Sequence, residues 1–341
     1  MRLLRPSLAL SAVALAAAAP ATASVSLQRL VGSTVMSALA GPPQASFLAR
    51  VRAGEVGGVI LVGHWQSTAR MAQTTRELQS AACERGTPLL IAVDQEGGWA
   101  RRLPWAAPSE TEGELGTGSA AHVEREARAA ASALLGAGVD VDFAPVTDTR
   151  LAPHSFLGGR AFSSDPSVVG RLAAAFVRGL QAGRVAATAK HFPGLGAATA
   201  NTDDHAVTVR ETRLEPFGSA IRAGARLVMV SNASYPRLDG SGRPAVFSRT
   251  IVTGLLRGTL GFKGVVVTDA LDAPTPAATP HAAARAIGAG VDLLLYTSGS
   301  TADRGYDSLL RDAASSSRLR TQIAAASDRI AALKRWLGRR C

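Results

Sequence analysis

Short apolar runs alternate with longer segments rich in Ala, Leu and Arg along nearly the whole chain, and this alternation limits the folds that the chain can adopt. Several runs are continuously apolar, and β-branched residues dominate the clearest of them, GVVVTD at 264–269. Such runs are typical of parallel strands covered on both faces. The runs predict eight strands: Val31–Ser37, Gly58–Val62, Leu89–Asp94, Val139–Val146, Val185–Lys190, Leu227–Ser231, Val265–Asp269 and Val291–Tyr296.

The segments between these runs favour helices. They are Ser67–Arg85, His122–Gly136, Pro166–Ala182, Pro216–Ala223, Ser248–Leu260 and Pro280–Ala289. Eight strands alternating with helices predict an α/β fold of one (β/α)8 TIM barrel, which we expect a helix over Leu319–Arg340 to close. The alternative is a doubly wound open sheet, which usually carries a G-x-G-x-x-G turn after an early strand. The turn after Val62 reads GHWQST instead.

The N-terminus has the features of a secretory signal peptide. Two arginines precede an uncharged apolar run at 8–19, and Ala21-Thr22-Ala23 supplies a cleavage signal. We therefore expect residues 1–23 to be a signal peptide and residues 24–341 to form one exported domain, secreted or held in the cell envelope. The alternatives are a buried N-terminal helix and an uncleaved membrane anchor. No later segment approaches the roughly 18 uninterrupted apolar residues of a membrane span.

Charge and composition bear on the binding partners. The formal charge of +11 becomes +9 without Arg2 and Arg5, which favours encounters with an anionic cell-wall polymer. Nucleic acid is not expected, because the basic residues are scattered and aromatic residues are 5% of the chain. We expect a monomer.

The chain has two cysteines, Cys83 and Cys341. They are too few for a cysteine-based metal site, and no metal is expected. An oxidising compartment would permit one disulfide between them, but their positions in the sequence do not establish that the sulfurs meet.

Polar residues follow five of the predicted strands. In a TIM barrel the carboxyl ends of the strands and the loops after them form the active face. One Asp at such a position more often caps the next helix, whereas five polar groups on one face favour a functional site. They are Asp94-Gln95-Glu96, Asp148, Lys190-His191, Ser231-Asn232 and Asp269. The stretch KHFPGLGAATANTDDH at 190–205 is the densest, since a connecting loop needs its turn residues but not its ionisable ones.

The same segments resemble glycoside hydrolase family 3. The similarity is carried, in chain order, by IAVDQEGG, FAPVTD, GGRAF, KHFPGLG, VMVSNASY and LGFKGVVVTDAL, and it runs from about Ser26 to Tyr296. IAVDQEGG and KHFPG are specific as a pair. The single-barrel form resembles the bacterial β-N-acetylglucosaminidases of this family.

The resemblance implies a retaining exo-glycosidase that needs no metal or organic cofactor, and the N-terminal signal implies that it is exported. Its partner would be a β-linked amino-sugar oligosaccharide or a muropeptide, from which it would remove terminal N-acetylglucosamine. Two alternatives remain open: a β-glucosidase-like exo-glycosidase of the same family, and a catalytically impaired sugar-binding barrel of the envelope.

The resemblance also implies catalytic roles. Asp269 of GVVVTD matches the family's nucleophile, and Asp203-Asp204-His205 matches an Asp-x-His pair on a mobile loop. In that pair His205 would be the general acid/base, and Asp203 would orient it and raise its basicity. The small residues of 194–200 predict that this loop is flexible.

Five further residues match the family's sugar-binding positions: Asp94, Arg102, Arg160, Lys190 and His191. Asp94 would accept hydrogen bonds from two sugar hydroxyls, and the four basic residues would donate to others.

The chain departs from the family pattern at three positions. Ala270 replaces a second acid, and Leu195 replaces a histidine. Trp99 stands where the family has an arginine, and this change would reshape the sugar pocket. His64 and Trp65 either stack on a second sugar or form a structural pair.

Overall fold

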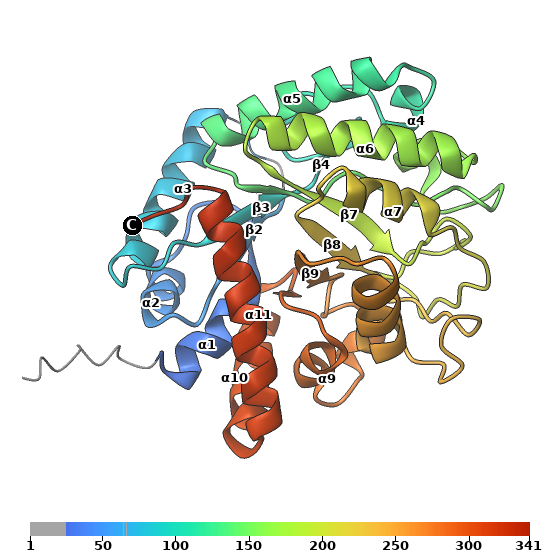
Figure 1. The fold of residues 1–341 in the computed structure, drawn as a ribbon. Helices are drawn as coiled ribbons and strands as arrows, with labels where there is room; N and C mark the ends of the chain where they lie inside the picture. The colour runs from blue at the N-terminus through green and yellow to red at the C-terminus, as the bar shows by residue number, and fades with distance from the viewer. Residues whose placement is uncertain (1–24, 64, 66) are drawn as a thin grey trace, which may run out of the picture.

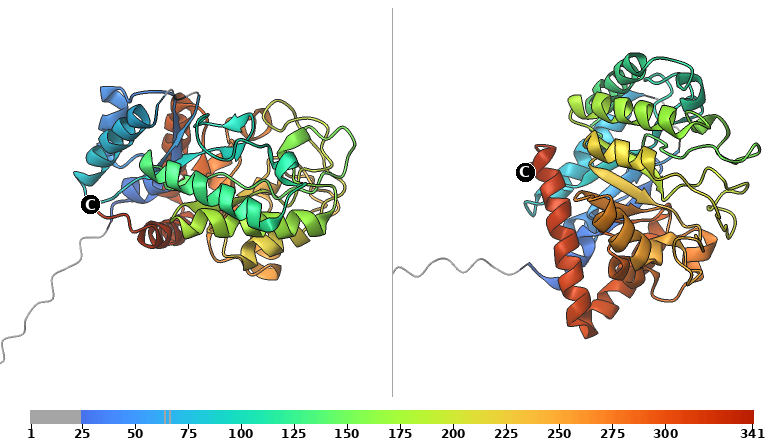
Figure 2. Two further views of the ribbon diagram at one scale, coloured as in Figure 1. Left: turned by 90° about the horizontal axis from the view of Figure 1, so that it is seen from above. Right: turned by 45° about the vertical axis from the view of Figure 1, so that its right-hand side comes forward.

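A computed structural model of the chain describes residues 25–63, 65 and 67–341. The predicted signal peptide and His64 lie outside the described residues. The eight main strands form one parallel sheet in the order β10-β1-β2-β3-β6-β7-β8-β9. A parallel bridge between Val267 and Leu293 joins the two ends of this order and closes the barrel. The helices surround the barrel, as Figures 1 and 2 show. The predicted (β/α)8 barrel is confirmed.

The strands agree with the predicted runs, and all except β7 are shorter; β7 continues past the predicted end at Lys190 to Phe192. Only the first run is partly wrong, because Val31–Ser33 belongs to a helix whose N-cap is Ser26. An additional antiparallel hairpin, β4 (Gln95–Gly97) with β5 (Ala100–Arg101), follows β3. The barrel strands are β1 (Val35–Leu39), β2 (Gly58–Leu61), β3 (Leu90–Val93), β6 (Val141–Asp142), β7 (Ala186–Phe192), β8 (Leu227–Val230), β9 (Val265–Thr268) and β10 (Leu294–Leu295).

Every predicted helical segment contains a helix. Several begin at side-chain caps: Ser67, Ser119 and Asp165 each accept a backbone N–H in the first turn. The helices are α1 (Leu27–Ser33), α2 (Ala45–Ala53), α3 (Thr68–Cys83), α4 (Glu112–Leu115), α5 (Ala120–Gly136), α6 (Pro166–Ala182), α7 (Glu215–Arg222), α8 (Pro274–Ala277), α9 (Ala282–Ala289), α10 (Gly299–Ser315) and α11 (Ser317–Trp336), with the short 3-10 turns η1 (Gly158–Arg160) and η2 (Ala245–Phe247) and the π-helix η3 (Thr250–Thr259). Among the α-helices, α1, α2, α4, α8 and α10 were not predicted.

The core has two layers. One lies between the strands and the surrounding helices, and the other fills the barrel. Ile330 and Leu333 of α11 pack into the inner layer, so this helix closes the end of the barrel at which the strands begin (Figure 1). The predicted role of the C-terminal helix is thereby confirmed. The opposite end of the barrel is left open for a site.

The chain end is fixed to the body by a disulfide between Cys83 and Cys341, whose Cα atoms are 5.1 Å apart. The sequence had left this pairing open. In Figure 1 the C-terminus lies beside α3, the helix that ends at Cys83. None of the helices in the described part of the chain is long and apolar enough to cross a membrane.

Candidate active site

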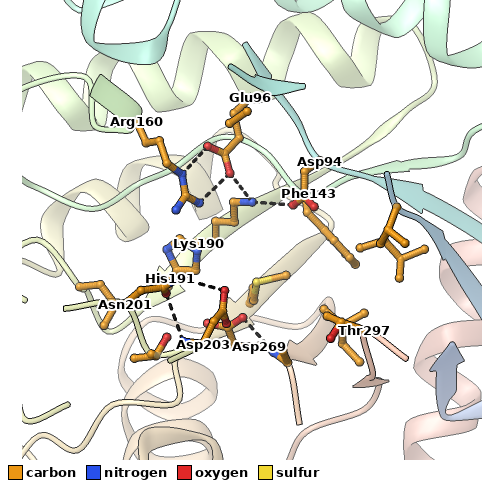
Figure 3. Close-up of a pocket in the computed structure, with 18 of the residues that line it drawn as sticks. Asp94, Glu96, Phe143, Arg160, Lys190, His191, Asn201, Asp203, Asp269 and Thr297 are labelled. Carbon is orange, nitrogen blue, oxygen red and sulfur yellow. Dashed lines mark hydrogen bonds and ion pairs between the residues drawn. The ribbon is translucent and has the colours of Figure 1, made fainter. Parts of the chain in front are cut away.

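A pocket of about 640 Å³ lies over the carboxyl ends of the strands. Its floor is the upper layer of the barrel core, including Phe143, Met229 and Leu295. Figure 3 shows polar side chains from several strands converging above this floor. Of the eight predicted site residues, seven line the pocket: Asp94, Arg102, Arg160, Lys190, His191, Asp203 and Asp269.

One wall is a buried network of charges centred on Glu96. Arg160 donates to both of its carboxylate oxygens, at 2.7 and 2.8 Å. The Lys190 ammonium lies 2.6 Å from Glu96 and 2.9 Å from Asp94. Arg102 approaches the other oxygen of Asp94 at 3.5 Å. The two carboxylates therefore fix Lys190 and Arg160 while leaving donors for a ligand.

The electrostatics of this network keep it charged. Burial alone would raise the pKa of Glu96, but the charges of Arg160 and Lys190 hold it well below its usual range. Burial would lower the pKa of Lys190, and the carboxylates of Asp94 and Glu96 raise it instead. Each charge thus depends on its partners, because an unpaired charge at this depth would be strongly disfavoured.

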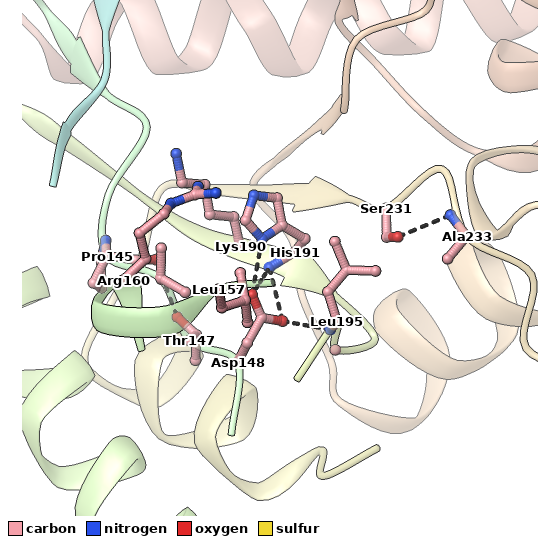
Figure 4. Close-up of polar contacts among 12 residues, drawn as sticks. Pro145, Thr147, Asp148, Leu157, Arg160, Lys190, His191, Leu195, Ser231 and Ala233 are labelled. Carbon is pink, nitrogen blue, oxygen red and sulfur yellow. Dashed lines mark hydrogen bonds and ion pairs between the residues drawn. The ribbon is translucent and has the colours of Figure 1, made fainter. Parts of the chain in front are cut away.

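His191 is fixed from below by Asp148. Its Nδ1 lies 2.8 Å from the Asp148 carboxylate, which also accepts the backbone N–H of His191 and of Leu195 (Figure 4). Asp148 is fully buried. If Nδ1 carries the proton and donates to this carboxylate, Nε2 is the ring nitrogen left for a ligand.

Asp269 and Asp203 lie on the same side of the pocket (Figure 3). Asp269 directly follows β9 and is half-buried, and one carboxylate oxygen accepts the Ala270 N–H at 2.9 Å. Asp203 comes from the loop after β7. Although its side chain keeps contact with solvent, the surrounding protein and the charge of Asp269 raise its pKa.

His205 is not brought to the pocket. Its side chain is exposed, and its backbone N–H donates to the Asn201 carbonyl. Asp203 shares hydrogen bonds with Asn201 rather than with His205. The predicted Asp-x-His pair is therefore open in this conformation, with the Asp in the pocket and the His outside it.

The segment 194–200, which precedes Asp203 in this loop, differs from the prediction of flexibility. Residues 194–196 are buried, and Leu151, Ala152 and Phe156 donate backbone N–H groups to Gly196 and Ala198. A Cβ at Gly196 would overlap the Thr149 carbonyl oxygen. These glycines and alanines thus permit close packing. The exposed segment 203–206 is the part with room to move.

The EGG motif forms the turn of the β4–β5 hairpin, where Gly97 and Gly98 both have positive φ. This turn presents Trp99, which is 68% exposed, at the edge of the pocket. Trp65 is buried and its indole donates to the Val62 carbonyl. The structural alternative therefore holds for Trp65, which does not stack on a ligand.

Sequence reasoning assigned no role to Glu96 or Asp148, although both follow predicted strands. Glu96 stands two residues after Asp94, a spacing that places both on one face of an extended segment. Asp142 was missed as well: it is fully buried beneath the network, and burial raises its pKa to about 8. Within residues 25–63, 65 and 67–341, no three His, Cys, Asp or Glu side chains are grouped so that they could hold a metal ion.

Comparisons with known proteins agree with this geometry. The family described as glycosyl hydrolase family 3 N-terminal domain matches residues 33–333. A β-hexosaminidase of Nitrosomonas eutropha is 36% identical over 264 residues, which cover 70% of this chain and 73% of that protein. An uncharacterized secreted glycosyl hydrolase of Arthroderma benhamiae is 34% identical over 310 residues, covering 85% and 87% of the two chains.

A solved structure has the same architecture. The crystal structure of a β-N-acetylhexosaminidase from Beutenbergia cavernae superposes with a TM-score of 0.85 at 32% identity, covering 92% of this chain and 99% of that one. The chain therefore belongs to glycosyl hydrolase family 3, is a glycoside hydrolase, and resembles the β-hexosaminidases of that family.

Proposed function

We propose that this glycoside hydrolase removes terminal β-linked N-acetylglucosamine by a retaining mechanism, with Asp269 as the nucleophile. The observation that carries the proposal is that Asp269 and Asp203 share one pocket with a fixed ring of donors and acceptors. Retention requires a carboxylate that attacks the anomeric carbon, and a group that protonates the leaving oxygen and then deprotonates water. The names of the β-hexosaminidase relatives support the amino sugar as the substrate.

The sugar would be held by the five predicted binding residues. Asp94 would accept hydrogen bonds from hydroxyls, and Arg102, Arg160, Lys190 and His191 would donate to them. The buried pairing of Lys190 and Arg160 with Glu96 supports this role, because a fixed donor loses little freedom when it binds.

For the proton, we assign His205 as acid/base and Asp203 as the residue that orients it. Because His205 is outside the pocket, this assignment requires segment 203–206 to fold inward when the substrate binds. Residues 203–206 are exposed, so little packing would have to break for this movement.

A second candidate for the proton donor is Asp203 itself. It already lines the pocket, and its raised pKa suits a carboxylic acid that gives a proton. The two assignments separate by mutation. If His205 is the donor, His205→Ala should be the more damaging change. If Asp203 is the donor, Asp203→Asn should be, and His205→Ala should be nearly silent.

We further propose that residues 1–23 direct export, that residues 24–341 form one catalytic domain acting as a monomer, and that the natural substrate is a peptidoglycan fragment. The secreted relative from Arthroderma benhamiae supports export. Trp99 supports an oligosaccharide, since an exposed indole at the edge of the pocket can stack on the next sugar ring.

The proposal is tested with aryl glycosides and a trapping reagent. The protein should release the aryl group from an N-acetylglucosaminide much faster than from a glucoside. A fluoro-sugar inhibitor should then label Asp269, as peptide mass mapping would show. Preference for the glucoside would favour the β-glucosidase alternative. Peptidoglycan fragments that bind and are recovered intact would favour the sugar-binding alternative.

A further inference from the structure

A second cavity, of about 410 Å³, lies at the end of the barrel opposite to the pocket. Three consecutive strands, β7, β8 and β9, are each preceded by a basic residue: Arg184, Arg226 and Lys263. Arg226, Lys263 and Arg329 line this cavity, and no acidic residue does among the described part of the chain. We call it the basal cleft.

Arg226 and its neighbour Arg184 both lie over the indole of Trp336 in α11, and Trp336 lines the basal cleft. The guanidinium carbon of Arg226 is 4.4 Å from the ring centroid, and that of Arg184 is 5.7 Å from it. Arg184 also donates to the Trp336 carbonyl at 3.2 Å. The ring favours each cation, but the two cations repel each other. Burial, and then the charge of Arg184, lower the pKa of Arg226.

Of the three cations that line the basal cleft, Arg329 is paired with Asp292, whereas Arg226 and Lys263 form no ion pair within the described residues. The Arg226 Nε is buried and has no hydrogen-bond partner among the described residues. Asp292 is fully buried, and its oxygens are bonded by Arg257 at 2.6 Å, Arg329 at 2.8 Å and the Val266 N–H at 2.8 Å. The charge of Asp292 is therefore shared by Arg257 and Arg329, and neither Arg226 nor Lys263 contacts it in the described structure.

We propose that the basal cleft binds a phosphate group carried by a soluble anionic chain. The planar fork of a guanidinium matches phosphate oxygens in bidentate fashion, and the stacking of Arg226 on Trp336 holds that fork in place. Because the basal cleft and the catalytic pocket lie at opposite ends of the barrel, a bound polymer would leave the pocket open.

A lipid surface fits the basal cleft less well. Proteins that lie on a bilayer insert exposed apolar side chains beside their basic ones. The large exposed hydrophobic residues of the described chain are Val25, Trp99, Trp105 and Leu135, and none of them lines the basal cleft.

Calorimetric titration of the purified protein with tripolyphosphate at low ionic strength tests this inference. We expect one binding site, and we expect Arg226→Gln to weaken it about tenfold or more, the usual loss for a charged hydrogen bond. The matched control is Arg76→Gln on α3, which removes the same charge from an exposed arginine outside the basal cleft and should change affinity less than about twofold.

Two more variants separate binding in the basal cleft from binding elsewhere on the protein. Arg102→Gln removes a cation from the catalytic pocket and should leave binding unchanged, whether or not the proposed glycosidase activity is found. Lys263→Gln changes an exposed residue and should also weaken binding, so it decides the question if Arg226→Gln does not fold. The proposal would be overturned if Arg76→Gln lost as much affinity for tripolyphosphate as Arg226→Gln, if Arg102→Gln lost affinity, or if the wild type did not bind. Tighter binding to polyglutamate or to phosphatidylglycerol vesicles would also overturn it.

Discussion

Replacing Glu96 with glutamine should destabilise the protein strongly while leaving its shape almost unchanged. The Glu96 side chain is 3% exposed and pairs with Arg160 and Lys190 through three contacts of 2.6 to 2.8 Å. Glutamine occupies the same volume but carries no charge. Among the described residues Arg160 would then have no ion-pair partner, and Lys190 would keep only Asp94. Breaking a buried ion pair from one side costs about 3–5 kcal/mol. For a domain of this size we expect a fall in Tm of roughly 4–8 °C.

The matched control is Glu124→Gln. Glu124 also contacts two arginines, Arg178 at 3.0 Å and Arg128 at 3.7 Å, but its side chain is 31% exposed. Surface pairs of this kind contribute at most about 1 kcal/mol. Urea unfolding followed by circular dichroism would compare both variants with the wild type. A Glu96→Gln protein no less stable than Glu124→Gln would refute the claim that this network supports the site.

The same substitution should show a defined pH dependence. The folded protein holds the pKa of Glu96 well below its unfolded value of about 4.3. The carboxylate therefore contributes its full stabilisation above that unfolded value and loses it as the pH falls toward the depressed one. The difference in unfolding free energy between wild type and Glu96→Gln should be constant near neutrality and shrink below about pH 4.

Four other outcomes are expected. Asp269→Asn should lower kcat by several orders of magnitude with ligand binding nearly intact, and unchanged turnover of an aryl substrate would discard the assignment. Asp142→Asn should become more stable than the wild type as the pH rises. The pKa of Asp142 is about 8 in the folded protein and about 4 in the unfolded one, so the wild type loses stability from about pH 4 upward. Equal pH profiles of the two proteins in thermal melts would contradict this. Trp99→Ala should raise KM for a disaccharide and spare an aryl monosaccharide, which steady-state kinetics would show. Cys83→Ser should destabilise the oxidised protein by up to about 5 kcal/mol and leave the reduced protein unchanged.

The sequence by itself determined the barrel, because the physics that selects it is local and repeated. Continuously apolar runs with β-branched residues become strands buried on both faces. Residues such as Asp165 and Pro166 begin a helix through contacts within its first turn. The position of a strand's end then places its next residue on the active face. That rule alone located Asp94, Lys190 and Asp269 at the pocket.

Only the tertiary structure decided which charges meet. Glu96 and Arg160 are 64 residues apart in the chain, and no local pattern pairs them. The same holds for Cys83 and Cys341, and for the two arginines that share the ring of Trp336. The loop after β7 is the sharpest case, since its small residues suggested freedom and instead allow close packing against Thr149. Backbone preferences are encoded by near neighbours, whereas pairing and packing depend on segments that meet only when the barrel closes.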